Sequence, residues 1–168
     1  MSESAFPPSD LSGFLQLCAG DWLALRSSLA LADPAPTGSE AAAGAEAAAE
    51  ESWHRCERGE LRIAYLAPEA PGDPGGLEIS PPQRPTRRLH FTRDGRFHDG
   101  GDQGEWQLWP DGSLELGVRA GEREVRERIW FTQPNLRLRS SVERGADGSP
   151  CRASFSSEIR RVSRPPAP

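Results

Sequence analysis

The residues best suited to ligand chemistry lie in the last third of the chain. If side chains alternate along a strand, Arg137, Arg139 and Ser141 share one face, and Glu127 precedes them on another segment. Guanidinium groups bind carboxylates through paired hydrogen bonds, and a nearby acid can face ring nitrogens. If these side chains point into a barrel, they suit an elongated, conjugated dicarboxylate.

The same periodicity allows a second arrangement, in which the polar faces of the strands are exposed to solvent. Arg137 and Arg139 would then be solvated, and Glu127 would pair with one of them. Exposed charged faces are the rule in soluble proteins, so periodicity alone favours this outward arrangement. The opposite face of the same strand is apolar and consists of Leu136, Leu138 and Val142.

The chain that must position these residues reads as one short helix followed by strands and turns. Leu11, Phe14 and Leu15 recur at helical spacing after Asp10, which can serve as the N-cap. Turn sequences such as Asp94-Gly95 separate the later segments. After a first strand that begins at Trp22, we expect strands over Leu61–Leu66, Leu77–Ile79, Arg88–Thr92, Arg96–His98, Glu105–Trp109, Ser113–Val118, Val125–Thr132, Leu136–Glu143 and Arg152–Val162.

Successive strands joined by short turns, with no helix between them, form a meander. Such a meander must close, because open edges would promote aggregation. We therefore expect an all-β, antiparallel meander barrel of about 8–10 strands with a short N-terminal helix. The helix followed by Gly20-Asp21-Trp22 resembles the entry of lipocalins and their calycin relatives. In those proteins a late arginine packs across the tryptophan, a role that Arg160 or Arg161 could fill.

Composition predicts one folded domain with three irregular segments. We expect a single barrel domain over residues 9–162, a disordered N-terminus over residues 1–8, and a disordered, Pro-rich tail over residues 163–168. Residues 32–52 carry Pro, Ala, Gly and Glu in a biased run, which predicts a flexible insertion where the fold tolerates variation.

The composition also excludes several classes of protein. A net charge of −5 argues against nucleic-acid binding, because phosphate contacts need a basic face. All 20 basic residues are arginine, which removes Schiff-base and P-loop lysine chemistry. No apolar run is long enough to span a membrane, and Glu3 stands where a secretory signal would be basic. The wide spacing of Cys18, Cys56 and Cys151 indicates a reducing cytoplasm. The cysteines and histidines together do not have the spacing of a metal site, so we expect none.

Two blocks of the sequence closely resemble the signature of the S/U-type phycobiliprotein lyases, which are bilin chromophore lyases. The first block is Phe14-Leu15-Gln16-Leu17, followed by Ala19-Gly20-Asp21-Trp22 and Arg26-Ser27. The second comprises Glu127-Arg128-Ile129-Trp130-Phe131, then Pro134–Val142, then Ala153–Arg160. The second block is long and specific, and the two lie at opposite ends of the expected barrel.

The resemblance implies a lipocalin-like barrel that binds a free phycobilin and attaches it, by a thioether bond, to a cysteine of an apo-phycobiliprotein α or β subunit. The bilin, phycocyanobilin or phycoerythrobilin, would be a substrate, with no permanently bound cofactor. Motif by motif, Arg137, Arg139 and Ser141 would bind the propionates and nearby polar atoms, with Arg26 assisting. Glu127 would be the catalytic residue, facing the pyrrole nitrogens. Protonation makes the ethylidene carbon more electrophilic, so the lyase needs no nucleophile of its own.

The resemblance fails in the middle of the chain, where residues 53–120 are shorter than in the usual lyase pattern. Trp53, Trp106 and Trp109 are the candidates there for stacking on the chromophore, although tryptophans more often serve cores. The shortening leaves the identity of the bilin and of its acceptor open.

Two other functions stand as alternatives. A non-catalytic bilin-binding or chaperone-like subunit of a heteromeric lyase would carry the same signature, so a second lyase subunit or a self-dimer stays open as a partner. A generic carrier of one fatty acid is disfavoured, because it has little need of Arg137, Arg139 and Glu127 together. We expect a cytoplasmic protein with no nucleic-acid partner and no membrane insertion.

Overall fold

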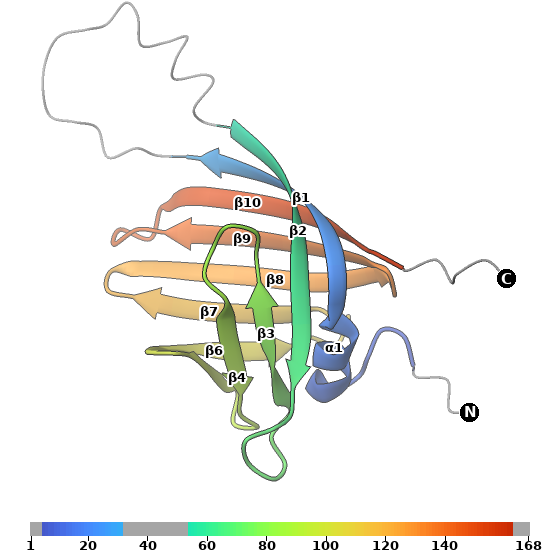
Figure 1. Ribbon diagram of the computed structural model, residues 1–168. Helices are drawn as coiled ribbons and strands as arrows, with labels where there is room; N and C mark the ends of the chain where they lie inside the picture. The colour runs from blue at the N-terminus through green and yellow to red at the C-terminus, as the bar shows by residue number, and fades with distance from the viewer. Residues whose placement is uncertain (1–4, 32–53, 163–168) are drawn as a thin grey trace, which may run out of the picture.

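The computed structural model describes residues 5–31 and 54–162 of the chain. Ten antiparallel strands, each paired with its neighbour in sequence, form a barrel that closes between the first strand and the last (Figure 1). The predicted meander barrel with a short N-terminal helix is therefore confirmed. The elements are α1 (Leu11–Cys18), β1 (Gly20–Ala30), β2 (His54–Leu66), β3 (Gly75–Ser80), β4 (Arg87–Phe91), β5 (Arg96–Asp99), β6 (Asp102–Leu108), β7 (Leu114–Ala120), β8 (Arg123–Gln133), β9 (Leu136–Arg144) and β10 (Pro150–Arg160).

The limits of some segments differ from the expectation. Strand β2 begins at His54 rather than at Leu61, because it pairs with β1 along nearly its whole length. Residues 5–8 belong to the N-terminal segment that was expected to be disordered, but the structure describes them and Pro8 is buried. The expected insertion over residues 32–52 and the expected tail over residues 163–168 lie outside the described residues, as do residues 1–4. None of the helices in the described part of the chain combines the length and apolarity that crossing a membrane requires.

Helix α1 closes one end of the barrel. It begins where Asp10 accepts a hydrogen bond from the backbone N–H of Gly13 at 2.8 Å, as the N-cap pattern predicted. Its apolar face, which includes Phe14 and Leu15, is fully buried against the barrel. The ring of Phe14 meets that of Phe131, at the end of β8, edge-on with centroids 5.3 Å apart.

Trp22, at the start of β1, ties the helix to the last strand. Its indole Nε1 donates to the carbonyl of Cys18 at 2.9 Å, and the guanidinium carbon of Arg160 lies 4.2 Å from its ring centroid. Arg160 also donates to the carbonyls of Leu17 and Ala19, which the end of α1 leaves without helical partners. Of the two candidates named from the sequence, Arg160 is therefore the late arginine that packs across Trp22. Arg161 instead pairs with the exposed Glu60 at 2.6 Å.

The core of the barrel is apolar on one side only. The inward side chains of β2–β8 form a continuous cluster, whereas the inward positions of β1, β9 and β10 include charged and hydroxyl groups. Arg137 is 2% exposed, so the interpretation that periodicity alone favoured, with the arginine face outward, is wrong. The inward apolar cluster consists of Leu61, Ile63, Leu77, Leu89, Phe91, Phe97, Leu114, Leu116, Ile129 and Phe131, with Trp22 and the α1 residues.

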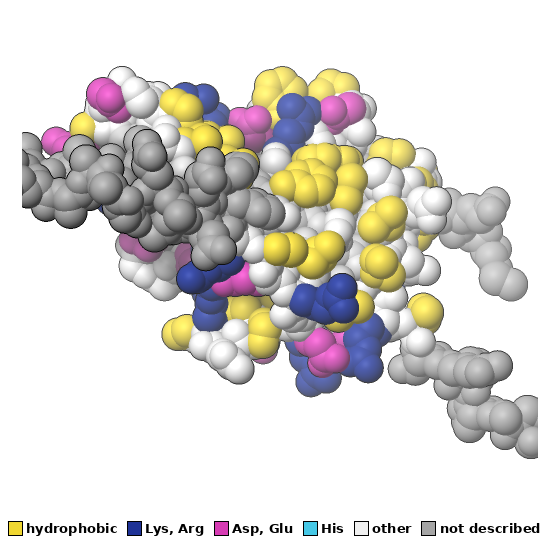
Figure 2. Space-filling model, turned by 90° about the horizontal axis from the view of Figure 1, so that it is seen from above, with side chains coloured by type: hydrophobic (Ala, Val, Ile, Leu, Met, Phe, Trp, Pro, Cys, Tyr) yellow, Lys and Arg dark blue, Asp and Glu magenta, His cyan; other side chains and the backbone are white. Residues whose placement is uncertain are grey.

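The outer face of β1 and β10 is correspondingly apolar. Figure 2 looks onto the molecule from above, where apolar side chains gather on this side of the barrel. Because neighbouring residues of a strand point to opposite faces, turning the arginines inward places the leucine positions outward. The large apolar side chains exposed there are Leu23, Leu25, Phe155 and Ile159.

Replacing Arg160 by Met should lower the free energy of unfolding by about 2–3 kcal/mol, because the cation–π contact is lost and two carbonyls lose their donor. Urea unfolding followed by tryptophan fluorescence measures the change. The matched control is Arg161→Met, which should change stability by less than about 0.5 kcal/mol because its ion pair is exposed. Equal effects of the two substitutions would contradict the proposed role of Arg160.

Candidate functional site

Two adjoining cavities lie inside the barrel, toward the end away from α1. Their volumes are about 500 and 430 Å³, and their linings overlap, so they form one site. The lining comes from strands β1, β2, β3, β4, β8, β9 and β10 and from the loop between β3 and β4. The residues shared by both linings are Arg26, Leu61, Pro81, Arg84, Arg139 and Ser156.

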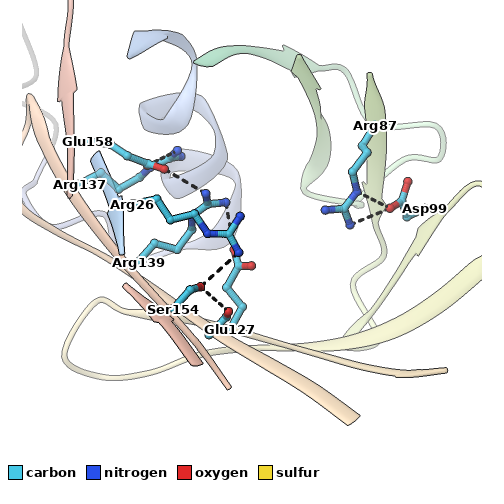
Figure 3. Close-up of polar contacts among 9 residues, drawn as sticks. Arg26, Arg87, Asp99, Glu127, Arg137, Arg139, Ser154 and Glu158 are labelled. Atoms are coloured by element: carbon cyan, nitrogen blue, oxygen red, sulfur yellow. Dashed lines mark hydrogen bonds and ion pairs between the residues drawn. The ribbon is translucent and has the colours of Figure 1, made fainter. Parts of the chain in front are cut away.

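The register of the strands brings the predicted polar residues together. Ser141 of β9 lies between Glu127 of β8 and Ser154 of β10, and the Oγ atoms of the two serines are 2.8 Å apart. Arg26 of β1 donates from Nη2 to Oγ of Ser154, which lies on the neighbouring strand β10, at 3.3 Å. Figure 3 shows Arg26, Glu127 and Ser154 meeting on one wall of the barrel. Four of the predicted residues, Arg26, Glu127, Arg139 and Ser141, line the smaller cavity.

Arg139 stands at the centre of this wall, between two carboxylates. Its Nη1 donates to Oε1 of Glu127 at 3.4 Å, and its Nη2 lies 3.2 Å from Oε1 of Glu158. Burial on its own would lower the pKa of Arg139, but the two carboxylates outweigh burial and raise it. Arg139 is therefore a permanent positive charge that lines both cavities.

Arg137 lies beneath the cavity rather than in its lining. Its Nε and Nη2 both lie 2.5 Å from Oε2 of Glu158, and its guanidinium carbon lies 5.0 Å from the centroid of Trp22. Both members of this ion pair are buried, with side-chain exposures of 2% and 0%. The second carboxylate oxygen of Glu158 accepts no hydrogen bond from the described residues and faces Arg139.

Sequence reasoning missed the role of Glu158. The available signal was its alternation with Ser154 and Ser156, which places all three on the inward face of β10. The register adds what alternation lacks, because Glu158 stands directly opposite Arg137 on β9. An acid in line with an inward arginine is the partner that a buried guanidinium requires.

Apolar side chains complete the lining of the cavities. They are Leu61 of β2, Ile79 of β3 and Val125, which lies on β8 with Glu127. Arg87 of β4 also lines the smaller cavity, but its Nη2 lies 2.7 Å from Oδ2 of Asp99, so the pair is largely neutral (Figure 3). The smaller cavity is lined by Arg26, Arg84, Arg87 and Arg139 against Glu127 as its one acid. A chain of net charge −5 thus has a cavity that combines positive charge with apolar side chains, which suits an anion with an apolar body.

The tryptophans predicted to stack on a ligand lie elsewhere. Trp106 donates from Nε1 to the carbonyl of Thr92 at 2.9 Å and packs against the core. Trp109 is exposed, with Arg128 5.7 Å from its ring centroid. Neither residue belongs to the lining of the two cavities, and Trp53 lies outside the described residues.

The cysteines show no activated nucleophile in the described part of the chain. Burial raises the pKa of Cys18, although Arg137 beside it acts in the opposite direction, so Cys18 is a neutral thiol. Cys56 is exposed, and Cys151 donates to the carbonyl of Glu143. The described residues also contain no group of three or more His, Cys, Asp or Glu side chains placed to hold a metal ion.

Comparisons with known proteins identify the relatives of this chain. A family model described as "CpeS-like protein" matches residues 101–161. Chromophore lyase CpcS/CpeS 1 of Paulinella chromatophora is 39% identical over 163 residues, which cover 96% of this chain and 94% of that protein. Chromophore lyase CpcS/CpeS 2 of Synechococcus sp. (strain JA-3-3Ab) is 36% identical over 60% of this chain and 53% of that protein.

A solved structure supports the fold. The S-type phycobiliprotein lyase CPES from Guillardia theta superposes with a TM-score of 0.63, covering 90% of this chain and 92% of that one. At 21% identity this likeness concerns the fold alone, and the two barrels correspond over nearly the whole of both chains.

Glu158→Gln should lower the free energy of unfolding by about 3–5 kcal/mol, because it leaves the buried charge of Arg137 without a counter-charge. Chemical unfolding monitored by circular dichroism gives the value. The double variant Arg137→Met with Glu158→Met should recover much of the loss, and the exposed Glu60→Gln should change little. A Glu158→Gln effect as small as that of Glu60→Gln would show that the pair is not structural.

Proposed function

The chain belongs to the CpcS/CpeS family of chromophore lyases, and we propose that it binds a free phycobilin and attaches it by a thioether bond to a cysteine of an apo-phycobiliprotein subunit. The observation that carries the proposal is the cavity, in which several arginines lie beside apolar side chains and a single acid, Glu127, in its smaller part. A linear tetrapyrrole has a matching combination of groups, with two propionates on one edge and apolar substituents along the remainder. We propose phycocyanobilin or phycoerythrobilin as the substrate.

Arg139 is the residue we assign to a propionate of the bilin. It lines both cavities, is charged, and is already oriented by Glu127 and Glu158, so little side-chain entropy is lost on binding. Ser141 and Ser154 offer hydroxyl groups beside it. Arg137 supports this arrangement from beneath, because it holds Glu158, which in turn orients Arg139. We therefore assign Arg137 a positioning role instead of the direct contact expected from its motif.

Glu127 is the group we assign to the pyrrole nitrogens. It lines the cavity beside Arg139 and is about one-quarter exposed, so it is accessible to a ligand. As a carboxylate it can stabilise a protonated tetrapyrrole, and as an acid it can donate the proton. A positively charged tetrapyrrole draws electrons away from its ethylidene group and makes that group a better electrophile.

The covalent step needs only the acceptor's thiol. The thiolate sulfur of the acceptor cysteine bonds to the ethylidene carbon, the double bond breaks, and a proton is added to the adjacent ring carbon. The barrel contributes conformation, protonation and exclusion of competing nucleophiles. The neutral, buried state of Cys18 is consistent with this division, because it keeps the lyase's own thiol from capturing the bilin. Three free cysteines suit a reducing compartment, and we place the reaction in the cytoplasm.

The test is a spectroscopic titration of the protein with phycocyanobilin and phycoerythrobilin, followed by addition of apo-phycobiliprotein α and β subunits one at a time. A coloured complex that passes its bilin covalently to one subunit would support the lyase proposal and identify both substrates. Binding without transfer would favour a partner-subunit role, to be tested by adding a second lyase of the family. Absence of binding would overturn the proposal.

Glu127→Gln should preserve bilin binding, shift the absorption maximum of the complex, and slow transfer to the acceptor. The amide keeps the size and hydrogen-bonding capacity of the side chain but neither carries a negative charge nor donates an acidic proton. Single-turnover transfer followed by absorbance measures the rate. An unchanged rate would remove Glu127 from the mechanism.

Arg139→Ala should weaken bilin binding by about 1.5–3 kcal/mol if the guanidinium bonds a charged propionate. Fluorescence or absorbance titration gives the dissociation constant, with folding checked by thermal unfolding. The control is Arg126→Ala on the outer face of β8, where the guanidinium pairs with Glu115 and Glu124. Loss of the same size in both variants would point to a general charge effect.

A further inference from the structure

The loop between β3 and β4 forms one side of the cavity entrance. It reads Pro81-Pro82-Gln83-Arg84-Pro85, and all five residues belong to the lining of at least one of the two cavities. Prolines fix φ at three of the five positions, and Gln83 has a φ of 56°, which few non-glycine residues adopt. The Oγ of Ser80 and the Oγ1 of Thr86 are 3.2 Å apart and join the two ends of the loop. The backbone freedom of the loop is thus reduced.

The loop is also seated directly on the barrel. Pro82 lies over Gly59 of β2, and a Cβ at position 59 would lie 3.0 Å from Cγ of Pro82. Such a separation is shorter than ordinary van der Waals contact, so the missing side chain of Gly59 allows the loop to approach the strand this closely. The contact between Pro82 and Gly59 fixes how closely the loop lies against β2 at the edge of the cavity.

Arg84 is the charged residue that this loop presents. Its side chain lines both cavities together with Arg26 and Arg139, and it is 61% exposed. Its ion-pair contact with Glu57 is long, 3.8 Å, and exposed, so it neutralises Arg84 only weakly. Arg26, Arg84 and Arg139 line both cavities. Burial and then the charges of Arg139 and Arg84 lower the pKa of Arg26, while Glu127 and Glu57 act in the opposite direction.

The arginines at the entrance are less fully paired than those deeper in the barrel, since Arg84 has only its long contact with Glu57 and Arg26 has no ion pair among the described residues. Arg139 reaches toward Glu127 and Glu158. Arg26 reaches the other way, toward Ser154, and its Nε is buried and donates to no group among the described residues. A buried donor without an acceptor is unfavourable, and a carboxylate of a ligand would satisfy it.

We propose that Arg84 and Arg26 form a second carboxylate-binding subsite at the cavity entrance, which holds one propionate of the bilin while Arg139 holds the other. This inference rests on the proposed function. The propionates of a bilin are carried by its two adjacent central rings, so the guanidinium groups of one cavity can engage both. Two bound carboxylates fix which edge of the tetrapyrrole faces the polar wall. A ligand with one carboxylate would not be held in a single orientation in this way.

The experiment compares phycocyanobilin with its dimethyl ester in the wild-type protein and in Arg84→Ala. Arg84→Ala should weaken binding of the diacid about tenfold and leave binding of the diester nearly unchanged. The matched control is Arg88→Ala, because Arg88 pairs with Glu78 and does not line either cavity. It should leave binding of both compounds unchanged.

Gly59→Ala provides a second, independent variant, because a Cβ there lies 3.0 Å from Cγ of Pro82 and requires the loop that carries Arg84 to shift by a few tenths of an ångström. It should weaken binding of the diacid more than that of the diester, by less than Arg84→Ala does, without removing any charge. If the wild-type protein binds neither compound, the proposed function fails. If it binds the diacid and Arg84→Ala binds both compounds as the wild type does, or loses both equally, the second subsite is refuted while the proposed function stands.

Discussion

The buried ion pair of Arg137 and Glu158 is the interaction on which the interior of this barrel depends. Removing two charges from water is unfavourable by several kcal/mol for each ion. A pair at this depth therefore persists only when the two groups are in close contact and other polar or aromatic groups surround them. Trp22 covers Arg137 at 5.0 Å, and Arg139 faces the second oxygen of Glu158 at 3.2 Å. The pair is therefore both the floor of the cavity and the support of Arg139, which lines both of its parts.

That pair also determines what the outside of the barrel looks like. Strands alternate their side chains, so a strand that turns Arg137 and Arg139 inward must turn its leucines outward. The same holds across the register on β10 and β1, where Phe155, Ile159 and Leu25 are exposed while Glu158 and Arg26 point inward. Three of the ten strands, β1, β9 and β10, are thus inverted relative to an ordinary soluble sheet, and the other seven, β2–β8, supply most of the hydrophobic stabilisation.

The division between these two sets of strands is what makes the cavity suitable for an amphipathic anion. Arginines line the cavity beside Leu61, Ile79 and Val125, and α1 with Phe14 and Trp22 closes the far end. Burial keeps Cys18 neutral, so the described residues show no activated thiol. This is consistent with the proposed transfer, in which the thiol comes from the acceptor protein.

The sequence by itself determined the helix, the meander, the closure of the barrel and, through two blocks that resemble the lyase signature, the family, because each depends on local periodicity, turn residues and motif spacing. It also placed Arg137, Arg139 and Ser141 on a common face. Only the tertiary structure decided that this face points inward, because alternation separates two faces without saying which one is buried. It likewise separated Arg137 from Arg139, paired Glu158 with the first, moved Trp106 and Trp109 away from the cavity, and brought Arg84 to its entrance. Those outcomes depend on register between strands and on the seating of a loop, which are contacts between residues far apart in the chain.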